Sequence, residues 1–221
     1  MRTIVYIDGF NLYYRMLKAN PHLKWVNPKR LAEEILNPSH IVTRVNYYTA
    51  RISARANDPN APARQAIYLN ALSSVLEMAV HEGSFMISEP WMALASPPAA
   101  KPQAYQWTLP VPEVVKVIKS EEKGSDVNLG AHLVRDAFLD RFDVAVVLTN
   151  DSDLVEPIRI AVQEAGKRVG LLVPVKHPTQ SLINVASFYL HIRPGHLSRS
   201  QFPDPIVLSD GTAIAKPLVW I

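Results

Sequence analysis

One short, wholly apolar stretch constrains the fold of this chain more than any other feature. Val144–Leu148 reads Val-Ala-Val-Val-Leu, with charged residues before it and polar residues after it. Such a run is typical of a strand that is buried on both faces of a parallel sheet. The polar segment that follows should open a helix, with Asn150 or Asp151 as its N-cap. Open α/β sheets carry their functional sites at the carboxyl ends of strands, so we expect a site at Asp151 and Asp153.

Strand and helix patterns alternate along most of the chain. Apolar, β-branched or aromatic runs predict strands at Thr3–Ile7, Ile41–Ala50, Phe85–Ser88, Val144–Leu148, Lys167–Val173 and Phe188–Ile192. Apolar residues at helical spacing predict helices at Asn11–Lys18, Ala63–His81, Ser152–Ala165 and Ser181–Ala186, and a short one that starts at Pro28. A further helix should run to Leu139, with Ser125 or Asp126 as its N-cap. Gly83 is expected to end the helix at Ala63–His81. This order predicts an α/β fold with a mainly parallel central sheet and helices on both faces. After Pro194 we expect loop, apart from a hairpin turn at Asp210-Gly211.

The composition excludes several classes of protein. The 221 residues include no cysteine, which rules out disulfides, thiol catalysis and thiolate metal sites. No apolar run approaches the roughly 20 residues that cross a membrane, and a charge comes too early for a signal peptide, so we expect a cytoplasmic protein. The net charge of +3 is too small to prove a polyanionic partner. Basic residues nevertheless gather at 44–64 and 167–199, either as solvated surface or as flanks for a phosphodiester.

Residues 90–112 differ in kind from the rest of the chain. Prolines at positions 90, 97, 98, 102, 110 and 112 rule out a regular helix, so we expect a long excursion or extended arm. Its aromatic residues Trp91, Tyr105 and Trp107 either stack on bases of a single strand or anchor the excursion onto the domain. We hypothesise that the excursion covers the cleft. Deleting Ser96–Gln103 should then alter substrate preference without unfolding the chain, and unchanged cleavage of several RNAs would contradict this.

Aspartates stand at three predicted junctions. Asp8 follows the first strand, Asp126 opens a helix, and Asp151 and Asp153 follow the Val144–Leu148 strand. If the two strands lie side by side at the topological switch point of the sheet, Asp8 lies next to the later pair. Clustered carboxylates repel one another and need a cation, and oxygen-only ligands favour Mg²⁺ or Mn²⁺ over Zn²⁺. The alternative for Asp126 and Asp153 is a purely structural role at the positive end of a helix dipole.

Three segments together resemble the NYN domain family, which belongs to the PIN-like nuclease superfamily. They are Tyr6–Tyr13 (YIDGFNLY), Glu121–Leu129 (EEKGSDVNL) and Thr149–Leu154 (TNDSDL). The similarity extends over residues 1–194, which we expect to form the domain, with 195–221 as a C-terminal appendage. The resemblance implies a PIN-like α/β/α sandwich that cleaves RNA with a divalent metal ion.

The resemblance also implies roles for the residues that match its motifs. The metal-binding acids would be Asp8, Asp126, Asp151 and Asp153. Asn11, one helical turn past Asp8, would orient a carboxylate or the scissile phosphate, the alternative being a helix-start hydrogen bond. Residues that would support the site or contact substrate are Asn128, Ser152 and Lys123. Independently of the family, Arg51 ends the second predicted strand near the site and is expected to contact phosphate.

The expected function is that of a metal-dependent endoribonuclease that uses Mg²⁺ or Mn²⁺. A cation would lower the pKa of a bound water and stabilise the charge that develops on the phosphorus and the leaving oxygen. The substrate would be single-stranded or structured RNA, while DNA and self-association into a homo-oligomer stay open. The alternative is a nucleic-acid-binding or regulatory module that does not cut. The four acids speak against it, because a binder of phosphates gains nothing from clustered negative charge.

Overall fold

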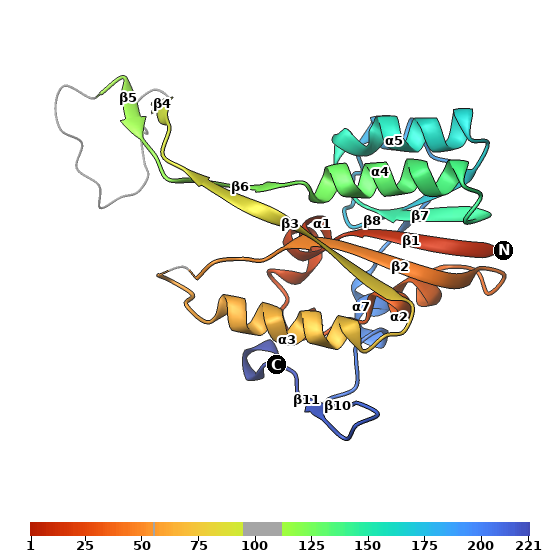
Figure 1. The fold of residues 1–221 in the computed structure, drawn as a ribbon, viewed down its shortest axis with the longest axis horizontal. Coiled ribbons are helices and arrows are strands. Elements are labelled where there is room, and N and C mark those ends of the chain that lie inside the picture. The colour runs from red at the N-terminus through yellow and green to blue at the C-terminus, as the bar shows by residue number, and fades with distance from the viewer. Residues whose placement is uncertain (55, 95–111) are drawn as a thin grey trace.

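The computed structural model describes residues 1–54, 56–94 and 112–221, which form an α/β fold around one large, curled and mostly parallel sheet (Figure 1). The strand order in this sheet is β6-β3-β2-β1-β7-β8-β9. Its members are β1 (Arg2–Asp8), β2 (Ile41–Ala50), β3 (Met78–Ser88), β6 (Lys119–Lys123), β7 (Val144–Leu148), β8 (Arg168–Val173) and β9 (Phe188–His191). Only the β3–β6 pair within it is antiparallel. The predicted fold class is confirmed.

Helices cover both faces of this sheet, as predicted. One face carries α4 (Ser125–Phe138), η3 (Ser152–Leu154), α5 (Val155–Arg159), η4 (Ile160–Glu164) and α6 (Gln180–Val185). The other carries α1 (Gly9–Leu12), η1 (Tyr13–Leu17), η2 (Pro21–Leu23), α2 (Pro28–Ile35), α3 (Ala61–Ser73), α7 (Pro194–Arg199) and η5 (Leu218–Trp220). Alternate residues of β1 serve the two cores, because successive side chains of a strand point to opposite faces. None of the helices in the described ranges has the length and apolar character needed to cross a bilayer.

The largest difference from the sequence-based expectation lies after α3. The helix predicted for Ala63–His81 ends at Ser73, and Met78–Ser88 forms a single strand, β3. Parallel pairing with β2, in which Val45 lies opposite Met78, replaces the helical hydrogen bonds that the apolar spacing suggested. Gly83 therefore lies inside a strand, where a Cβ would come within 2.7 Å of the Lys123 carbonyl oxygen.

Two further expectations are wrong in detail. The N-cap of α4 is Gly124, with a φ of 99° that suits glycine, so neither Ser125 nor Asp126 caps this helix. The segment after Pro194 is not all loop, because α7 begins at this proline, whose fixed φ suits the first helical position. The predicted hairpin at Asp210-Gly211 is confirmed as β10 (Ile206–Val207) paired with β11 (Ala213–Ile214).

The C-terminal segment is packed against the body of the fold. The side chains of Phe202, Ile206 and Trp220 are buried in the same core as β1. Trp25 connects the segment to the rest of that core, because its indole N–H donates to the Pro203 carbonyl over 3.0 Å. The division of the chain at residue 194 stays a prediction.

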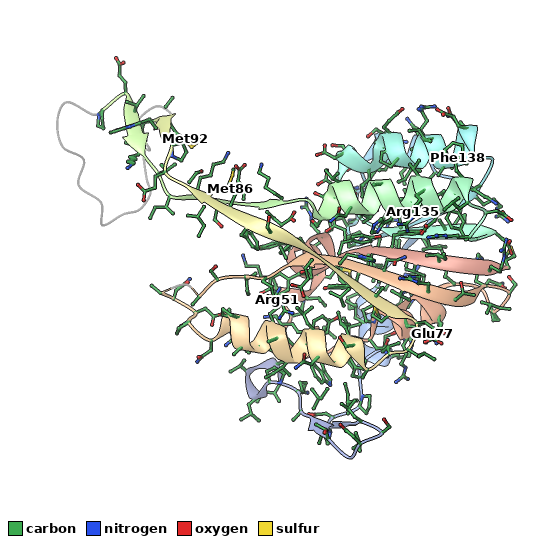
Figure 2. All side chains as sticks on the ribbon, viewed as in Figure 1. Arg51, Glu77, Met86, Met92, Arg135 and Phe138 are labelled. Carbon is green, nitrogen blue, oxygen red and sulfur yellow. The ribbon has the colours of Figure 1, made fainter. Side chains whose placement is uncertain are left out.

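A two-stranded arm extends away from the body of the fold (Figure 1). It is formed by the outer half of β3 with β6 and, further out, by β4 (Trp91–Ala93) with β5 (Val114–Lys116). Figure 2 shows Met86 and Met92 along it, and both side chains are exposed, as is Trp91. Tyr105, Trp107 and Ser96–Gln103 lie outside the described residues, so the hypotheses about them stay predictions.

Candidate active site

Asp8 occupies a central position at the carboxyl end of the sheet. It is the last residue of β1, which lies between β2 and β7, with Ile7 opposite Leu148. The predicted adjacency of the first strand and Val144–Leu148 is thus confirmed. Asp8 is also the N-cap of α1, and its Oδ1 accepts a hydrogen bond from the Asn11 backbone N–H over 2.9 Å. Only 3% of Asp8 is exposed, so its carboxylate sits in a fixed, nearly dry position.

Two side chains orient the Asp8 carboxylate. The Asn11 amide donates to Oδ2 over 2.5 Å, and the Thr149 hydroxyl donates to the same oxygen over 3.2 Å. Burial raises the pKa of Asp8, while the hydrogen bonds from Asn11 and Thr149 oppose this rise because they favour the charged form. Asn11 thus contacts a carboxylate, and its backbone N–H also makes a helix-start hydrogen bond to the same residue, so its role in the site stays a prediction.

Thr149 links Asp8 to the acids that follow β7. Its hydroxyl oxygen accepts from the Asp151 backbone N–H over 3.0 Å, and the residue is fully buried. Asp151 in turn caps η3, accepting from the Asp153 backbone N–H over 3.1 Å, as its predicted N-cap role requires. Thr149 was missed as a site residue in the sequence analysis. Its signal was a polar side chain directly after a wholly buried strand.

Asp126, the second residue of α4, shares the electrostatic field of these acids. Burial, followed by the negative charges of Asp8, Asp151, Glu122 and Asp153, raises the pKa of Asp126 from 3.8 to about 7. The four predicted aspartates therefore lie within electrostatic reach of one another. Glu122 adds a fifth acid that was missed in the sequence analysis, and it is fixed by hydrogen bonds from the Ser125 N–H and hydroxyl over 3.0 and 2.7 Å.

The chemistry of this donor set fits a hard divalent cation such as Mg²⁺ or Mn²⁺. All the clustered side chains offer carboxylate oxygens, and their mutual repulsion would be relieved by a positive ion. Within residues 1–54, 56–94 and 112–221, however, no three histidine or acidic side chains are close enough together to hold one ion. Asp126 and Asp153 line a groove of about 460 Å³ between α4 and α5. The exposed Glu156 on its rim is paired with Arg159 over 2.6 Å.

The remaining predicted site residues do not gather on the Asp8 carboxylate. Arg51 forms a bidentate pair with Glu82, with a shortest distance of 2.7 Å, at the end of β2 (Figure 2). Lys123 Nζ lies 3.6 Å from Glu121 Oε2, so this lysine forms an ion pair with a neighbouring acid. Ser152 is exposed and Asn128 is half-buried on α4. Their roles in binding substrate stay predictions.

A second hollow begins one residue beyond Asp8, on the α3 side of the sheet. It has a volume of about 310 Å³ and is bounded by α1, η1, the end of β2, α3 and η5. We call it the aromatic pocket because of the rings among its lining residues, which are Phe10, Tyr13, Tyr14, Tyr47, Tyr68 and Trp220. Gly9 also lines it, and a Cβ there would come within 2.8 Å of the Tyr47 ring. No pattern in the sequence predicted this pocket.

A mostly parallel, curled sheet flanked by helices, with acids at the ends of its central strands, is the arrangement that the resemblance to the PIN-like class of α/β proteins predicted. More closely, residues 97–193 match the family model of the NYN domain, which belongs to that superfamily, so the predicted resemblance is confirmed. The match supports a nuclease-like fold, and nucleases of this family typically use divalent metals and act on nucleic acids.

Two individual proteins add to this comparison. The chain is 29% identical, over its whole length and 75% of the relative's, to 6-hydroxy-3-succinoylpyridine 3-monooxygenase HspA of Pseudomonas putida (strain DSM 28022 / S16). The crystal structure of VPA0982 from Vibrio parahaemolyticus RIMD 2210633, a protein of unknown function, resembles 87% of this chain and 93% of its own at a TM-score of 0.50. That pair is 15% identical, so the likeness concerns the fold alone.

Proposed function

We propose that this chain is a metal-dependent endoribonuclease that hydrolyses phosphodiester bonds at the aspartate cluster. The observation that carries the proposal is the hydrogen-bonded link from Asp8 through Thr149 to Asp151, across the ends of β1 and β7. It holds two acids from distant parts of the chain beside each other at the place where open α/β sheets carry their sites. The NYN match over residues 97–193 supports the same function.

The aspartate cluster Asp8, Asp126, Asp151 and Asp153 would hold the cation partly through water molecules, since Mg²⁺ is usually bound by one or two carboxylates and keeps several waters. The chain's other residues would position these acids. When bound, a divalent ion supplies an activated water and offsets the charge that develops on the phosphate. Asn11 and Thr149 fix the orientation of the Asp8 carboxylate, because each donates a hydrogen bond to Oδ2. Burial of Asp8 limits the water around it, which strengthens its interaction with any cation.

Other predicted residues would contact the RNA. Lys123 is exposed next to the start of α4, and Arg51 would exchange part of its pairing with Glu82 for a phosphate oxygen. Exposed ion pairs contribute little, about 0–1 kcal/mol, so such an exchange is cheap. Asn128 and Ser152 flank the aspartates in sequence and would support the cation site.

The test compares wild type with Asp151→Asn on single-stranded RNA, duplex RNA and single-stranded DNA, each with Mg²⁺, Mn²⁺ and EDTA. Asp143→Asn is the matched control, because it removes an exposed carboxylate, paired with Arg2, that directly precedes β7, whereas Asp151 follows that strand. We expect metal-dependent cutting of RNA that Asp151→Asn abolishes and Asp143→Asn retains. Cutting that survives Asp151→Asn would contradict the proposed site. Preferential cutting of DNA would make the chain a Mg²⁺-dependent DNA nuclease, and binding of RNA without cutting would favour a non-cleaving module.

A second candidate function comes from the relative that is named as a monooxygenase. The aromatic pocket favours it, because ligand pockets for small aromatic molecules are concave, largely apolar and of about 300–1,000 Å³. The test is incubation with 6-hydroxy-3-succinoylpyridine, O₂ and a reductant such as NADH, with mass spectrometry of the product. Turnover that survives Asp151→Asn but not Tyr14→Leu would favour this candidate over the ribonuclease.

A further inference from the structure

The aromatic pocket has a rigid inner wall and a more open rim. Tyr47, Tyr68 and Trp220 form the wall and are between 5 and 8% exposed. Their rings pack against one another with centroids 6.2 Å apart for Tyr47 and Tyr68 and 6.1 Å apart for Tyr68 and Trp220. At the rim, Tyr13 and Tyr14 are 36% and 54% exposed. A flat ring entering from solvent would therefore meet aromatic surface on several sides.

Two lysines add positive charge to this rim. Lys18 Nζ lies 5.1 Å from the centroid of the Tyr14 ring, and Lys24 Nζ lies 5.5 Å from that of Tyr13. In the described parts of the chain neither lysine makes an ion pair with a carboxylate, whereas Arg64, the third cation of the lining, is bound by Asp58. Burial, followed by the charge of Arg64, lowers the pKa of Lys24. Two cations are thus available to an anionic group.

The pocket is directly connected to the candidate active site. Gly9 and Phe10 line it and follow Asp8 in the chain. The Asp8 carboxylate is close enough to the pocket wall that its charge contributes to the raised pKa of Tyr47, after the larger effect of burial. A molecule that occupies the pocket therefore lies close to Asp8 of the aspartate cluster.

We propose that the aromatic pocket receives one unpaired base of the RNA strand next to the bond that is cut, with a phosphate of that strand held by Lys18 and Lys24. The inference rests on the proposed ribonuclease function and adds a single-stranded substrate and a base-binding subsite to it. Unpaired bases stack on aromatic side chains with little regard to sequence, because every base has a flat π-face. Duplex RNA keeps its bases stacked inside the helix and would not fill the pocket.

The test is isothermal titration calorimetry on the full chain carrying Asp151→Asn, in EDTA, so that binding is measured without cleavage. The probes are adenosine 5′-monophosphate, ribose 5-phosphate, which lacks the base, and benzoate, which is an aromatic acid without a sugar phosphate. The pocket variants are Tyr14→Leu and Lys24→Gln. Their matched controls are Tyr189→Leu, a tyrosine 45% exposed on β9, and the exposed Lys176→Gln.

We expect adenosine 5′-monophosphate to bind at least tenfold more tightly than either other probe. Each pocket variant should weaken it at least tenfold, and neither control should. Equal binding of ribose 5-phosphate would overturn the proposal in favour of a simple anion site. Tighter binding of benzoate would assign the pocket to a small aromatic acid. If neither pocket variant changed the affinity for adenosine 5′-monophosphate, the nucleotide would bind outside the pocket and the proposal would be overturned. Metal-dependent cleavage of RNA by wild type without nucleotide binding would overturn the subsite and leave the ribonuclease in place.

Discussion

The aspartate cluster and the aromatic pocket meet at the same turn, Asp8-Gly9, yet they are built in opposite ways. In the cluster, Asp8 ends β1 and Asp151 follows the adjacent strand β7, so the strand order of the sheet sets their positions, while Asp126 comes from the first turn of α4. The pocket consists of rings and lysines from helices, from the end of β2 and from the C-terminal η5, so it depends on how separate segments pack. Sheet topology alone can therefore bring acids together, whereas a binding pocket needs the packing of the whole fold.

The largest expected effect is on cleavage, and it should leave nucleotide binding in the aromatic pocket unchanged. Asp8→Asn should reduce metal-dependent cleavage by on the order of 10³-fold, more than the 10–100-fold typical of a residue that only supports a ligand. Folding should survive, because burial already disfavours the charged form of Asp8. Cleavage assays measure the first effect, and calorimetric titration with adenosine 5′-monophosphate shows whether the pocket still binds. Loss of nucleotide binding together with cleavage would show that the two regions are not separable.

Thr149→Val tests whether the link between Asp8 and Asp151 matters for cleavage. The change removes the acceptor for the Asp151 N–H, which is left unpaired, and one of the two side-chain donors to Asp8 Oδ2, which keeps its hydrogen bond from Asn11. We expect cleavage to fall 10–100-fold and the free energy of unfolding to fall by about 1–3 kcal/mol. Thr149→Ser keeps the hydroxyl and should retain most of the cleavage rate and most of the free energy of unfolding. Cleavage assays and urea denaturation measure these two quantities. A serine variant as impaired as the valine variant would point to packing instead of hydrogen bonding.

Gly9→Ala should affect the aspartate cluster and the aromatic pocket together, because Gly9 follows Asp8 and lines the pocket. Its Cβ would lie 2.7 Å from the Tyr48 carbonyl oxygen and 2.8 Å from the Tyr47 ring, so α1 would have to shift. We expect a loss of about 1–3 kcal/mol in unfolding free energy, as for other overpacked sites. Nucleotide binding and cleavage should weaken together. Gly195→Ala, in α7, is the control, because a Cβ there would meet only the end of the flexible Arg199 side chain, at 3.3 Å. Cleavage that is normal in Gly9→Ala would contradict the shared role.

The smallest expected effect concerns charge at Asp126. Because its pKa is raised from 3.8 to about 7, the folded chain binds more protons than the unfolded chain between these values, and stability falls as pH rises through this window. Asp126→Asn should therefore match wild type near pH 4 and be more stable at pH 8. The half-exposed site limits the gain to about 1 kcal/mol or less, a rise in Tm of ~2–4 °C. Mg²⁺ should reduce the difference in Tm between Asp126→Asn and wild type. Equal Tm values at pH 8 without metal would contradict the repulsion between Asp126 and the neighbouring acids.

Much of the sheet was predictable from the sequence, and so was the meeting of the aspartates. Val144–Leu148 is apolar throughout because both faces of β7 are covered, and its short length and its valines favour a buried strand over a helix. The adjacency of β1 and β7 then followed from a general rule of doubly wound sheets. Thr149 was not predicted as a site residue, because a single hydroxyl side chain produces no periodic pattern in the sequence.

Two of the differences from the sequence-based expectation share a physical cause, since both depend on contacts that are distant in sequence. Residues 74–81 have apolar spacing that suits a helix, but pairing with β2 makes the second half of this segment a strand. The aromatic pocket combines Phe10 with Trp220, and no local pattern predicts that these two meet. Packing, not propensity, decided both outcomes.

The Asp8–Thr149 hydrogen bond spans 141 residues, and this span has a consequence for how the chain is made. At about 5–20 residues per second, synthesis leaves β1 without β7 for on the order of 10 s. During that time one edge of β1 is open and Asp8 lacks a hydrogen-bond donor that fixes it. The proposed ribonuclease is therefore without its cutting site until β7 and Thr149 have been synthesised.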